Sequence, residues 1–271
     1  MPAINLTQLS TQIAELIKLA DDAPAFKQAF LNLLSFYHRY AHRVQKDEIP
    51  FTFMRHFDLP DQIIPQLELE LQTLPEEKPQ ETLQIIEALW EDAHFESRDL
   101  AAFLLGRLPA DYQGEAAARI KNWLEAPIDR AVVRSVLTKA TVILKSGTGA
   151  AWKTLLQQLL ESPHAPVRRH GLAALAGDAA RRNLDELPWL FRLTRPFLQH
   201  YNEDEQAYLS LLIRALAENS PEETAYFLKQ ILSDTNTRVI ERQFRQYLSC
   251  FPPEQQESLN TAIKAHSERE I

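Results

Sequence analysis

The sequence predicts an all-α fold, a solenoid of stacked helical hairpins of the HEAT type. Three observations predict it. Apolar residues recur three or four positions apart along most of the chain, prolines fall at the breaks between these segments, and only 6 of 271 residues are glycine. Proline removes a backbone donor and clashes inside a helix, so it belongs at helix boundaries. Tight-turned β-sandwiches and doubly wound sheets with Gly-rich loops normally need more glycine.

The periodic segments follow one another with short polar gaps. The first apolar stripe runs from Leu6 to Ala20, and the second from Phe26 to Tyr40. Further amphipathic helices are expected near residues 60–74, 80–91, 96–107, 114–124, 129–145, 150–161, 165–177, 183–199, 204–218, 222–233, 236–248 and 254–266. Gaps marked by proline or aspartate between segments of this length are typical of helix–turn–helix units.

These units also resemble one another. Residues 92–108 and 162–177 each place a polar turn before an arginine, followed by small and large apolar residues and a glycine. Equivalent points recur at steps of 36, 34, 40 and 32 residues, at Ser97, Val133, Val167, Ala207 and Val239. That period is typical of HEAT repeats, and the Trp-Leu-Gly pattern of tetratricopeptide repeats is absent. Since one hairpin cannot bury its own apolar faces, the hairpins must stack.

Composition and termini narrow the class of protein. With 45% hydrophobic and 24% charged residues, the chain is expected to be globular and soluble. The single cysteine, Cys250, excludes an internal disulfide framework and a multi-cysteine metal site. No basic start followed by an apolar run opens the chain, and no stretch reaches 18 apolar residues, so a cytoplasmic protein without a membrane span is expected. We expect residues 1–60 to form capping helices and residues 61–271 the solenoid, in one continuous domain.

Charge is unevenly distributed along the chain. The formal net charge is −8, but residues 61–99 hold 11 acidic and 2 basic side chains, whereas residues 119–200 hold 13 basic and 6 acidic ones. A local positive field governs where a polyanion docks, so residues 119–200 are a candidate docking segment. The alternative is that solvated helix faces simply vary in sign.

Two motifs resemble functional sites, a phosphate-binding loop and a metal site, but each lacks a residue that such a site needs. Residues 147–154 resemble a phosphate-binding loop, but Trp152 stands where the loop needs glycine before its Lys-Thr pair, which favours a glycine stop between two helices. His38 and His42 have the spacing of two metal ligands, but Arg39 stands where a zinc hydrolase has glutamate, and no third ligand follows. We therefore expect neither a metal nor a cofactor.

Three segments carry a resemblance to a known family. Residues 89–98 with the apolar run that follows them, residues 162–169 with their arginine pair, and residues 208–221 with their turn proline occur in matching order. Together they resemble the bacterial DNA alkylation repair family, over roughly residues 80–250. That family consists of HEAT-like alkylpurine DNA glycosylases, so the resemblance implies a concave basic surface that grips duplex DNA.

The same resemblance implies a catalytic site for base excision. An alkylated, cationic base is already a good leaving group, so aromatic faces and a carboxylate need only stabilise the developing sugar cation, without flipping the base into a deep pocket. Carried over by position, the site comprises Trp123, Asp129 and Arg214. Two departures stand out: Trp123 and Asp129 are six residues apart where the family has four, and Leu211 replaces a tryptophan three residues before Arg214. For Trp123, core packing is the alternative.

The expected DNA-binding residues are Arg134, Lys153, Arg168, Arg169 and Arg214. For Arg168, the alternative is a structural arginine that bonds across its turn. Two functions remain open. The first is a DNA-binding member of the family that excises alkylated purines or has lost that step, and the second is a non-catalytic scaffold whose groove binds a protein helix or tail.

Overall fold

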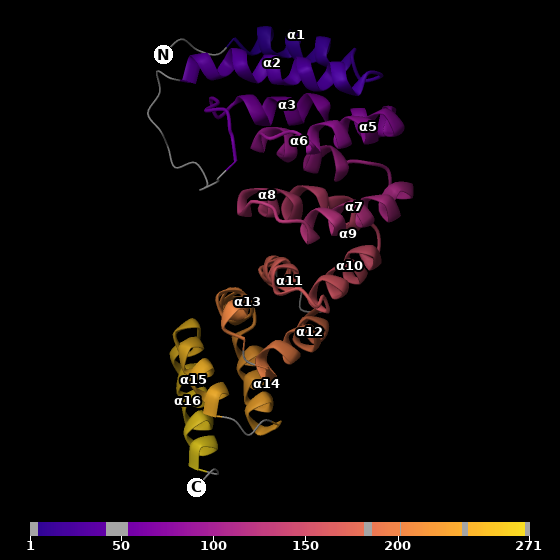
Figure 1. Cartoon of the computed structure of the whole chain (residues 1–271). Coiled ribbons are helices and arrows are strands. Elements are labelled where there is room, and N and C mark those ends of the chain that lie inside the picture. The colour runs from indigo at the N-terminus through magenta and orange to yellow at the C-terminus, as the bar shows by residue number, and fades with distance from the viewer. Residues whose placement is uncertain (1–4, 42–53, 182–185, 201, 235–237, 269–271) are drawn as a thin grey trace. The chain divides into compact units, whose positions relative to one another are not determined.

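The computed structural model describes residues 5–41, 54–181, 186–200, 202–234 and 238–268. Over these residues the chain is all-α; an isolated bridge between Arg55 and His94 is the only strand-like pairing within them. The predicted all-α helical-repeat fold is confirmed. The helices gather into two compact units, Met1–Lys153 and Thr154–Ile271. Figure 1 shows the hairpins following one another along each unit.

The first unit begins with two long helices and continues as hairpins. Its α-helices are α1 (Leu6–Ile17), α2 (Ala23–Ala41), α3 (Ile63–Leu71), α4 (Leu74–Glu77), α5 (Pro79–Trp90), α6 (Phe95–Leu105), α7 (Gln113–Glu125), α8 (Arg130–Ser135) and α9 (Val142–Lys145). A 3-10 turn, η1 (Ala110–Tyr112), precedes α7, and a π-helical turn, η2 (Val136–Ala140), joins α8 to α9. Within this unit α2 packs on α5, α6 packs on α5, α8 and η2, and α7 packs on α9.

In the second unit the hairpins continue. Its helices are α10 (Ala150–Leu160, which begins at the boundary), α11 (Ala165–Ala179), α12 (Leu187–Gln199), α13 (Gln206–Asn219), α14 (Pro221–Asp234), α15 (Arg238–Tyr247) and α16 (Pro253–Glu268), with 3-10 turns η4 (Glu203–Glu205) and η5 (Leu248–Cys250). Here α11 packs on α13, and α14 packs on α12, α13 and α16. Phe244 and Tyr247 are among its largest fully buried side chains.

The predicted repeat points fall at equivalent places in the helices. Ser97, Val133, Val167, Ala207 and Val239 all lie in the first four residues of α6, α8, α11, α13 and α15. These five are the second helices of their hairpins. The spacing read from the sequence therefore identified the repeated element.

Two predicted helices differ in detail. Residues 129–145 do not form one helix, because η2 interrupts it, and the helix expected over 60–74 is divided into α3 and α4. At η2 the interruption coincides with a close approach of backbones: a Cβ on Gly106 of α6 would lie 2.0 Å from the carbonyl oxygen of Lys139. This tertiary contact has no counterpart in local periodicity. The capping role expected for residues 1–60 stays a prediction, with Leu9, Ile13 and Leu16 of α1 buried against the neighbouring helices.

Candidate nucleic-acid interface

Arg98 and Arg168 occupy the same position in their repeats and make the same contact. Each is the fourth residue after a histidine N-cap, His94 in α6 and His164 in α11. The Arg98 Nε donates to the carbonyl oxygen of Asp92 at 3.2 Å, and the Arg168 Nη1 donates to that of Ser162 at 2.9 Å. Both carbonyls lie six residues earlier, so each arginine closes the turn between the two helices of its hairpin.

Arg168 also locks two hairpins together. Its Nε and Nη2 both lie 2.7 Å from Oε1 of Glu205, the N-cap residue of α13, whose side chain is only 6% exposed. A phosphate that took this guanidinium would leave a buried carboxylate without its cation, which is strongly unfavourable. The geometry favours the structural alternative for Arg168, and DNA contact by this residue stays an unsupported prediction.

Arg134 and Arg169 lie one residue further from their N-caps. Each is the fifth residue after the cap, Asp129 in α8 and His164 in α11. One residue rotates a side chain by about 100° around a helix, so neither arginine follows the path that Arg98 and Arg168 take to the turn carbonyls. Arg134 is exposed and Arg169 half-buried, and neither guanidinium has a hydrogen-bond or ion-pair partner among the described residues.

Two exposed arginines, Arg130 and Arg214, lie on the second helices α8 and α13. Arg130 precedes Arg134 by four residues on α8, so both lie on one face of that helix, and Arg214 lies on α13, which packs on α11. Within the described part of the chain, neither guanidinium has a hydrogen-bond or ion-pair partner, and both are exposed. Sequence reasoning missed Arg130, although its spacing to Arg134 signals a shared face. Lys153 is half-buried in α10 and stays a weaker candidate.

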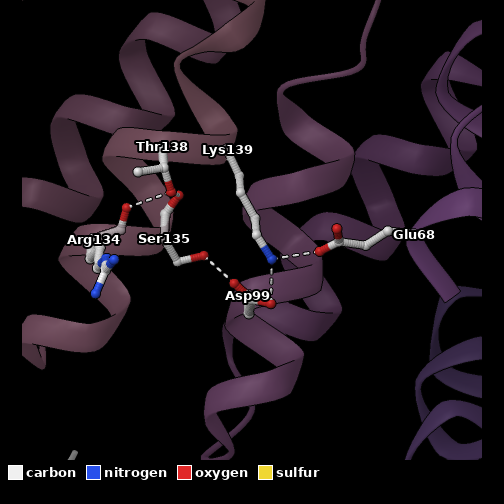
Figure 2. Close-up of polar contacts among 6 residues, drawn as sticks. All are labelled: Glu68, Asp99, Arg134, Ser135, Thr138 and Lys139. Carbon is white, nitrogen blue, oxygen red and sulfur yellow. Dashed lines mark hydrogen bonds and ion pairs between the residues drawn. The ribbon is translucent and has the colours of Figure 1, made fainter. Parts of the chain in front are cut away.

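Lys139, a cation of the basic segment, is paired with carboxylates of other helices (Figure 2). Its Nζ lies 2.5 Å from Oε1 of Glu68 and 2.6 Å from Oδ2 of Asp99, and the Ser135 hydroxyl donates to the other Asp99 oxygen. Burial lowers the pKa of the Lys139 ammonium, but the two carboxylates outweigh burial and raise the pKa above its ordinary value. This network ties η2 to α3 and α6 and so fixes the helix that carries Arg134.

The acidic and basic segments neutralise each other between hairpins. Arg119 of α7 contacts Glu87 of α5 at 2.7 Å, as Lys139 contacts Glu68 and Asp99. Arg119 also contacts Glu115 of its own helix at 3.1 Å. The excess charge of residues 119–200 is therefore smaller at the surface than in the sequence. Among the described residues of this segment, Arg130, Arg134 and Arg169 of the second helices and Arg192 of α12 keep their charge without a partner.

In the first unit, an aromatic stack lies where the C-terminal ends of α5 and α7 meet. The Trp90 and Trp123 rings are stacked, with centroids 3.7 Å apart and planes 10° apart, and the Arg98 guanidinium carbon lies 5.4 Å from the Trp90 centroid. Trp123 is 5% exposed, whereas Trp90 is half-buried. The stack favours the core-packing alternative for Trp123, and the more accessible ring is that of Trp90.

The remaining residues expected to act in catalysis are distributed over both units. Asp129 begins α8, where its Oδ1 accepts the Ala131 N–H at 2.8 Å and caps the helix. Trp123 and Asp129 belong to the first unit, and Arg214 belongs to the second. Leu211, three residues before Arg214, is 55% exposed, so an apolar side chain stands on the surface where the family resemblance expects a tryptophan. The catalytic role of the three residues stays a prediction.

The glycine-containing loop at residues 147–154 and the histidine His38 both have structural roles in the fold. Gly147 and Gly149 adopt φ of 62° and 65° between α9 and α10, and Trp152 is buried under the Lys145 ammonium at 4.2 Å. The His38 Nδ1 accepts the Asp58 N–H at 3.1 Å, and His42 lies outside the described residues. Among the residues that are described, no cluster of three or more histidine, cysteine or acidic side chains could hold a metal.

Comparison with known families places this geometry in context. The family model of the DNA alkylation repair enzyme matches residues 64–248, more than half of the chain and including every second helix from α6 to α15. The chain belongs to the DNA alkylation repair enzyme family. The family resemblance in the sequence is thereby confirmed, and with it a function related to DNA repair.

Other comparisons add little to the DNA alkylation repair assignment. No curated protein matches the chain significantly. Among solved structures, the crystal structure of an engineered protein is similar at 13% sequence identity and a TM-score of 0.34, over 96% of this chain and 69% of that one. That similarity is too low to indicate a shared function. No helix in the described ranges is long and apolar enough to cross a membrane.

Proposed function

We propose that this member of the DNA alkylation repair enzyme family binds duplex DNA through arginines that have no partner among the described residues and lie on three of its second helices, α8 in the first unit and α11 and α13 in the second. The observation that carries the proposal is that some cations of the repeats have partners within the protein and others do not. Arg98, Lys139 and Arg168 are held inside the repeats, whereas Arg130, Arg134, Arg169 and Arg214 have no partner among the described residues. Guanidinium groups of this kind bind phosphate oxygens without reading sequence.

The proposal predicts how steeply the affinity for DNA falls as the salt concentration rises. Each phosphate contact releases counterions, so the slope of log K against log salt is about −0.9 per contact on duplex DNA. Four arginines predict a slope of about −3.6. The affinity is measured by fluorescence anisotropy of a labelled 20-base-pair duplex between about 50 and 200 mM salt, the range over which such slopes are resolved.

Paired substitutions test each unit separately. Arg130→Gln with Arg134→Gln, and Arg169→Gln with Arg214→Gln, should each weaken binding and reduce the slope by about 1.8. Lys264→Gln on α16 is the control, because Lys264 is also an exposed cation but lies on a helix that is not one of the second helices. Equal losses in the control and the paired variants, or no duplex binding at the lowest salt, would sink the proposal.

The proposal is confined to binding, because the aromatic surfaces that the family reaction uses are reduced here. Leu211 replaces one tryptophan, and the Trp123 ring is covered by Trp90. We therefore expect tight binding of alkylated duplex without rapid release of alkylpurine. Release from alkylated DNA above the rate of uncatalysed depurination would contradict this expectation.

Asp129→Asn is the control variant for such a release assay. Asparagine caps a helix as well as aspartate does, so the substitution removes the negative charge while keeping the start of α8. Release that wild-type protein supports and Asp129→Asn abolishes would assign a catalytic role to the carboxylate. Release that both proteins support equally would assign it elsewhere.

A further inference from the structure

A groove in the second unit lies outside the proposed DNA surface. It has a volume of about 610 Å³ and is lined by residues of α12 and α14. These are the first helices of two successive hairpins, and both are labelled in Figure 1. Its floor is aromatic: Phe191 and Phe227 stack with centroids 4.4 Å apart, and Tyr226 beside them is 65% exposed. A large exposed tyrosine next to a stacked aromatic pair is typical of a surface that accepts an apolar anchor from a partner.

The two helices bring opposite charges to opposite ends of this groove. Phe191 pairs with Phe227 and, further along both helices, Arg195 pairs with Asp234 at 2.9 Å, so α12 and α14 run in the same direction along the groove. Glu222 and Glu223 therefore lie at the end where the helices begin. Arg192 directly follows Phe191 and lies level with the aromatic pair, whereas Arg195 lies further towards the other end, with its guanidinium carbon 5.7 Å from the Phe227 centroid.

These charges are available to a ligand. Among the described residues, neither glutamate has an ion-pair or hydrogen-bond partner, and the exposed Arg192 has none either. Arg195 is partly neutralised by Asp234. Because the groove carries two free carboxylates against little more than one free cation, it does not favour a polyanion. It fits a ligand with a positive group, an apolar centre and a negative group in that order.

We propose that the groove between α12 and α14 docks a short peptide segment of another protein, with an aromatic anchor between a basic and an acidic residue. The spacing follows from helix geometry. Glu223 and Gln230, both lining residues, are seven positions apart on α14, about 10 Å along its axis. An extended peptide rises about 3.3 Å per residue, so the ends of a five-residue segment are about 13 Å apart, enough to cover that length, and its alternate side chains face the same way. The matching motif is basic–x–aromatic–x–acidic.

A designed peptide series tests the motif on the full chain. The probe is a fluorescein-labelled peptide with the core Lys-Ser-Phe-Ser-Asp, followed by anisotropy. It should bind at least about fivefold more tightly than cores with two lysines or two aspartates, because each of those leaves one end of the groove facing a like charge. Replacing its phenylalanine with serine should abolish binding. Equal affinity for all charged cores, or no binding of the probe at millimolar protein, would overturn the proposal.

Two variants tie the binding to this groove. Tyr226→Ser should weaken the probe by about tenfold or more, as loss of a central aromatic contact does, whereas Leu211→Ser, an exposed apolar residue of the same unit, should leave it unchanged. Arg192→Glu should shift the preference to the core with two lysines. That gain of binding cannot come from unfolding, so its absence in a folded variant would contradict the charge assignment.

Other occupants would be recognised by the same reagents. A concentration-dependent dimer that Tyr226→Ser dissociates in sedimentation velocity would assign the groove to a second copy of the chain. Competition by a single-stranded oligonucleotide that Tyr226→Ser removes would assign it to nucleic acid. Either result would overturn the peptide proposal and leave the duplex-binding prediction for the second helices unaffected.

Discussion

In the first unit, the earlier helix α6 supplies the carboxylate of Asp99 and the later segment η2 supplies the cation Lys139. In the second unit the order is reversed, because Arg168 on the earlier helix α11 reaches Glu205 at the start of α13. Both arrangements join second helices of successive hairpins. In both interfaces a buried carboxylate is paired with a cation. The helix that supplies the carboxylate and the helix that supplies the cation are exchanged between the two units.

The difference also explains which cations remain for a ligand. Arg168 ends in a salt bridge because it is the fourth residue after its N-cap, and Arg169, one residue later, does not. In α6 the fifth residue after the N-cap is the buried Asp99, so the same position holds a buried carboxylate in α6 and, in α8 and α11, an arginine without a partner among the described residues. Each substitution below changes one side of this comparison.

The largest effect is expected from Arg168→Met. The variant leaves the Glu205 side chain, 6% exposed, without its cation and the carbonyls of Ser162 and Pro163 without their donor. Loss of one partner of a buried pair destabilises by about 3–5 kcal/mol. Hydrogen exchange should show the loss of protection in α11 and α13 and unchanged protection in α5 and α6. The matched control is Arg98→Met, which removes one carbonyl contact and a cation–π contact and should cost about 1 kcal/mol.

A second, somewhat smaller effect is expected from Gly106→Ala. The new Cβ would meet the main-chain carbonyl oxygen of Lys139 at 2.0 Å, so α6 and η2 must separate, at a cost of about 3 kcal/mol. In the second unit a Cβ on Gly171 would lie 3.0 Å from the Leu160 side chain and 3.2 Å from the Leu160 main-chain nitrogen, so a shift of a few tenths of an ångström is enough and Gly171→Ala should cost about 1 kcal/mol. Gly177→Ala meets nothing within 4 Å and should stabilise by a few tenths to about 1 kcal/mol, since alanine favours helix. Urea denaturation of the three variants measures the order, and equal losses at Gly106 and Gly171 would contradict it.

The extent to which the sequence predicted this molecule depends on the range of the interactions. Helical periodicity and repeat spacing are local, and they located Ser97, Val133 and Val167 at the starts of second helices. The roles of the arginines depend on which neighbour each side chain meets. A one-residue offset from the N-cap separates Arg134 from Arg168, and spacing of about 35 residues cannot resolve that offset.

The same reasoning applies to contacts between hairpins. Glu68 and Lys139 are 71 residues apart, and their pairing turns two segments of opposite charge into partners. A count of charges along the chain therefore overstated the basic surface. The Trp90–Trp123 stack joins residues of two hairpins in the same way, so a tryptophan proposed from position as a reactive face lies packed against another ring.

Lys139→Met should have an intermediate effect and test the first unit's version of the ion pair. Asp99 is 9% exposed in its side chain and would keep only the Ser135 hydroxyl as a partner, while Glu68 is 23% exposed and partly solvated. Because Lys139 itself is 28% exposed, the loss should be about 2 kcal/mol, below that of Arg168→Met. The raised pKa of Lys139 has a sign as well: its stabilisation is present below its ordinary pKa of 10.5 and is lost as pH rises through the folded value.

A double substitution separates the pair from its parts. Lys139→Met with Asp99→Leu removes both charges, and the double variant should be more stable than Lys139→Met alone, because no carboxylate is then left buried without a cation. Denaturation near neutral pH measures the difference. If the double variant lost the sum of the two single losses, the two side chains would not be coupled, and the comparison with Arg168 and Glu205 would fail.

Glu96 offers the smallest and most specific test, because it is a buried carboxylate that forms no ion pair with a cation among the described residues. Its Oε1 accepts the Phe57 N–H at 2.8 Å and its Oε2 has no partner, and burial raises its pKa to about 7 despite the opposing influence of that N–H, His56 and His94. A carboxyl whose folded pKa is raised contributes stability below its ordinary pKa of 4.5 and loses it as pH rises towards 7. Glu96→Gln keeps the acceptor and removes the charge, so at pH 8 it should be more stable than wild type by about 1 kcal/mol, after the unpaired amide that replaces Oε2 is allowed for. The two proteins should differ little near pH 4.5, and since the histidines titrate in both, the difference between their urea curves isolates Glu96. A difference that does not change with pH would mean that this carboxylate, like Glu205, is neutralised in the folded chain.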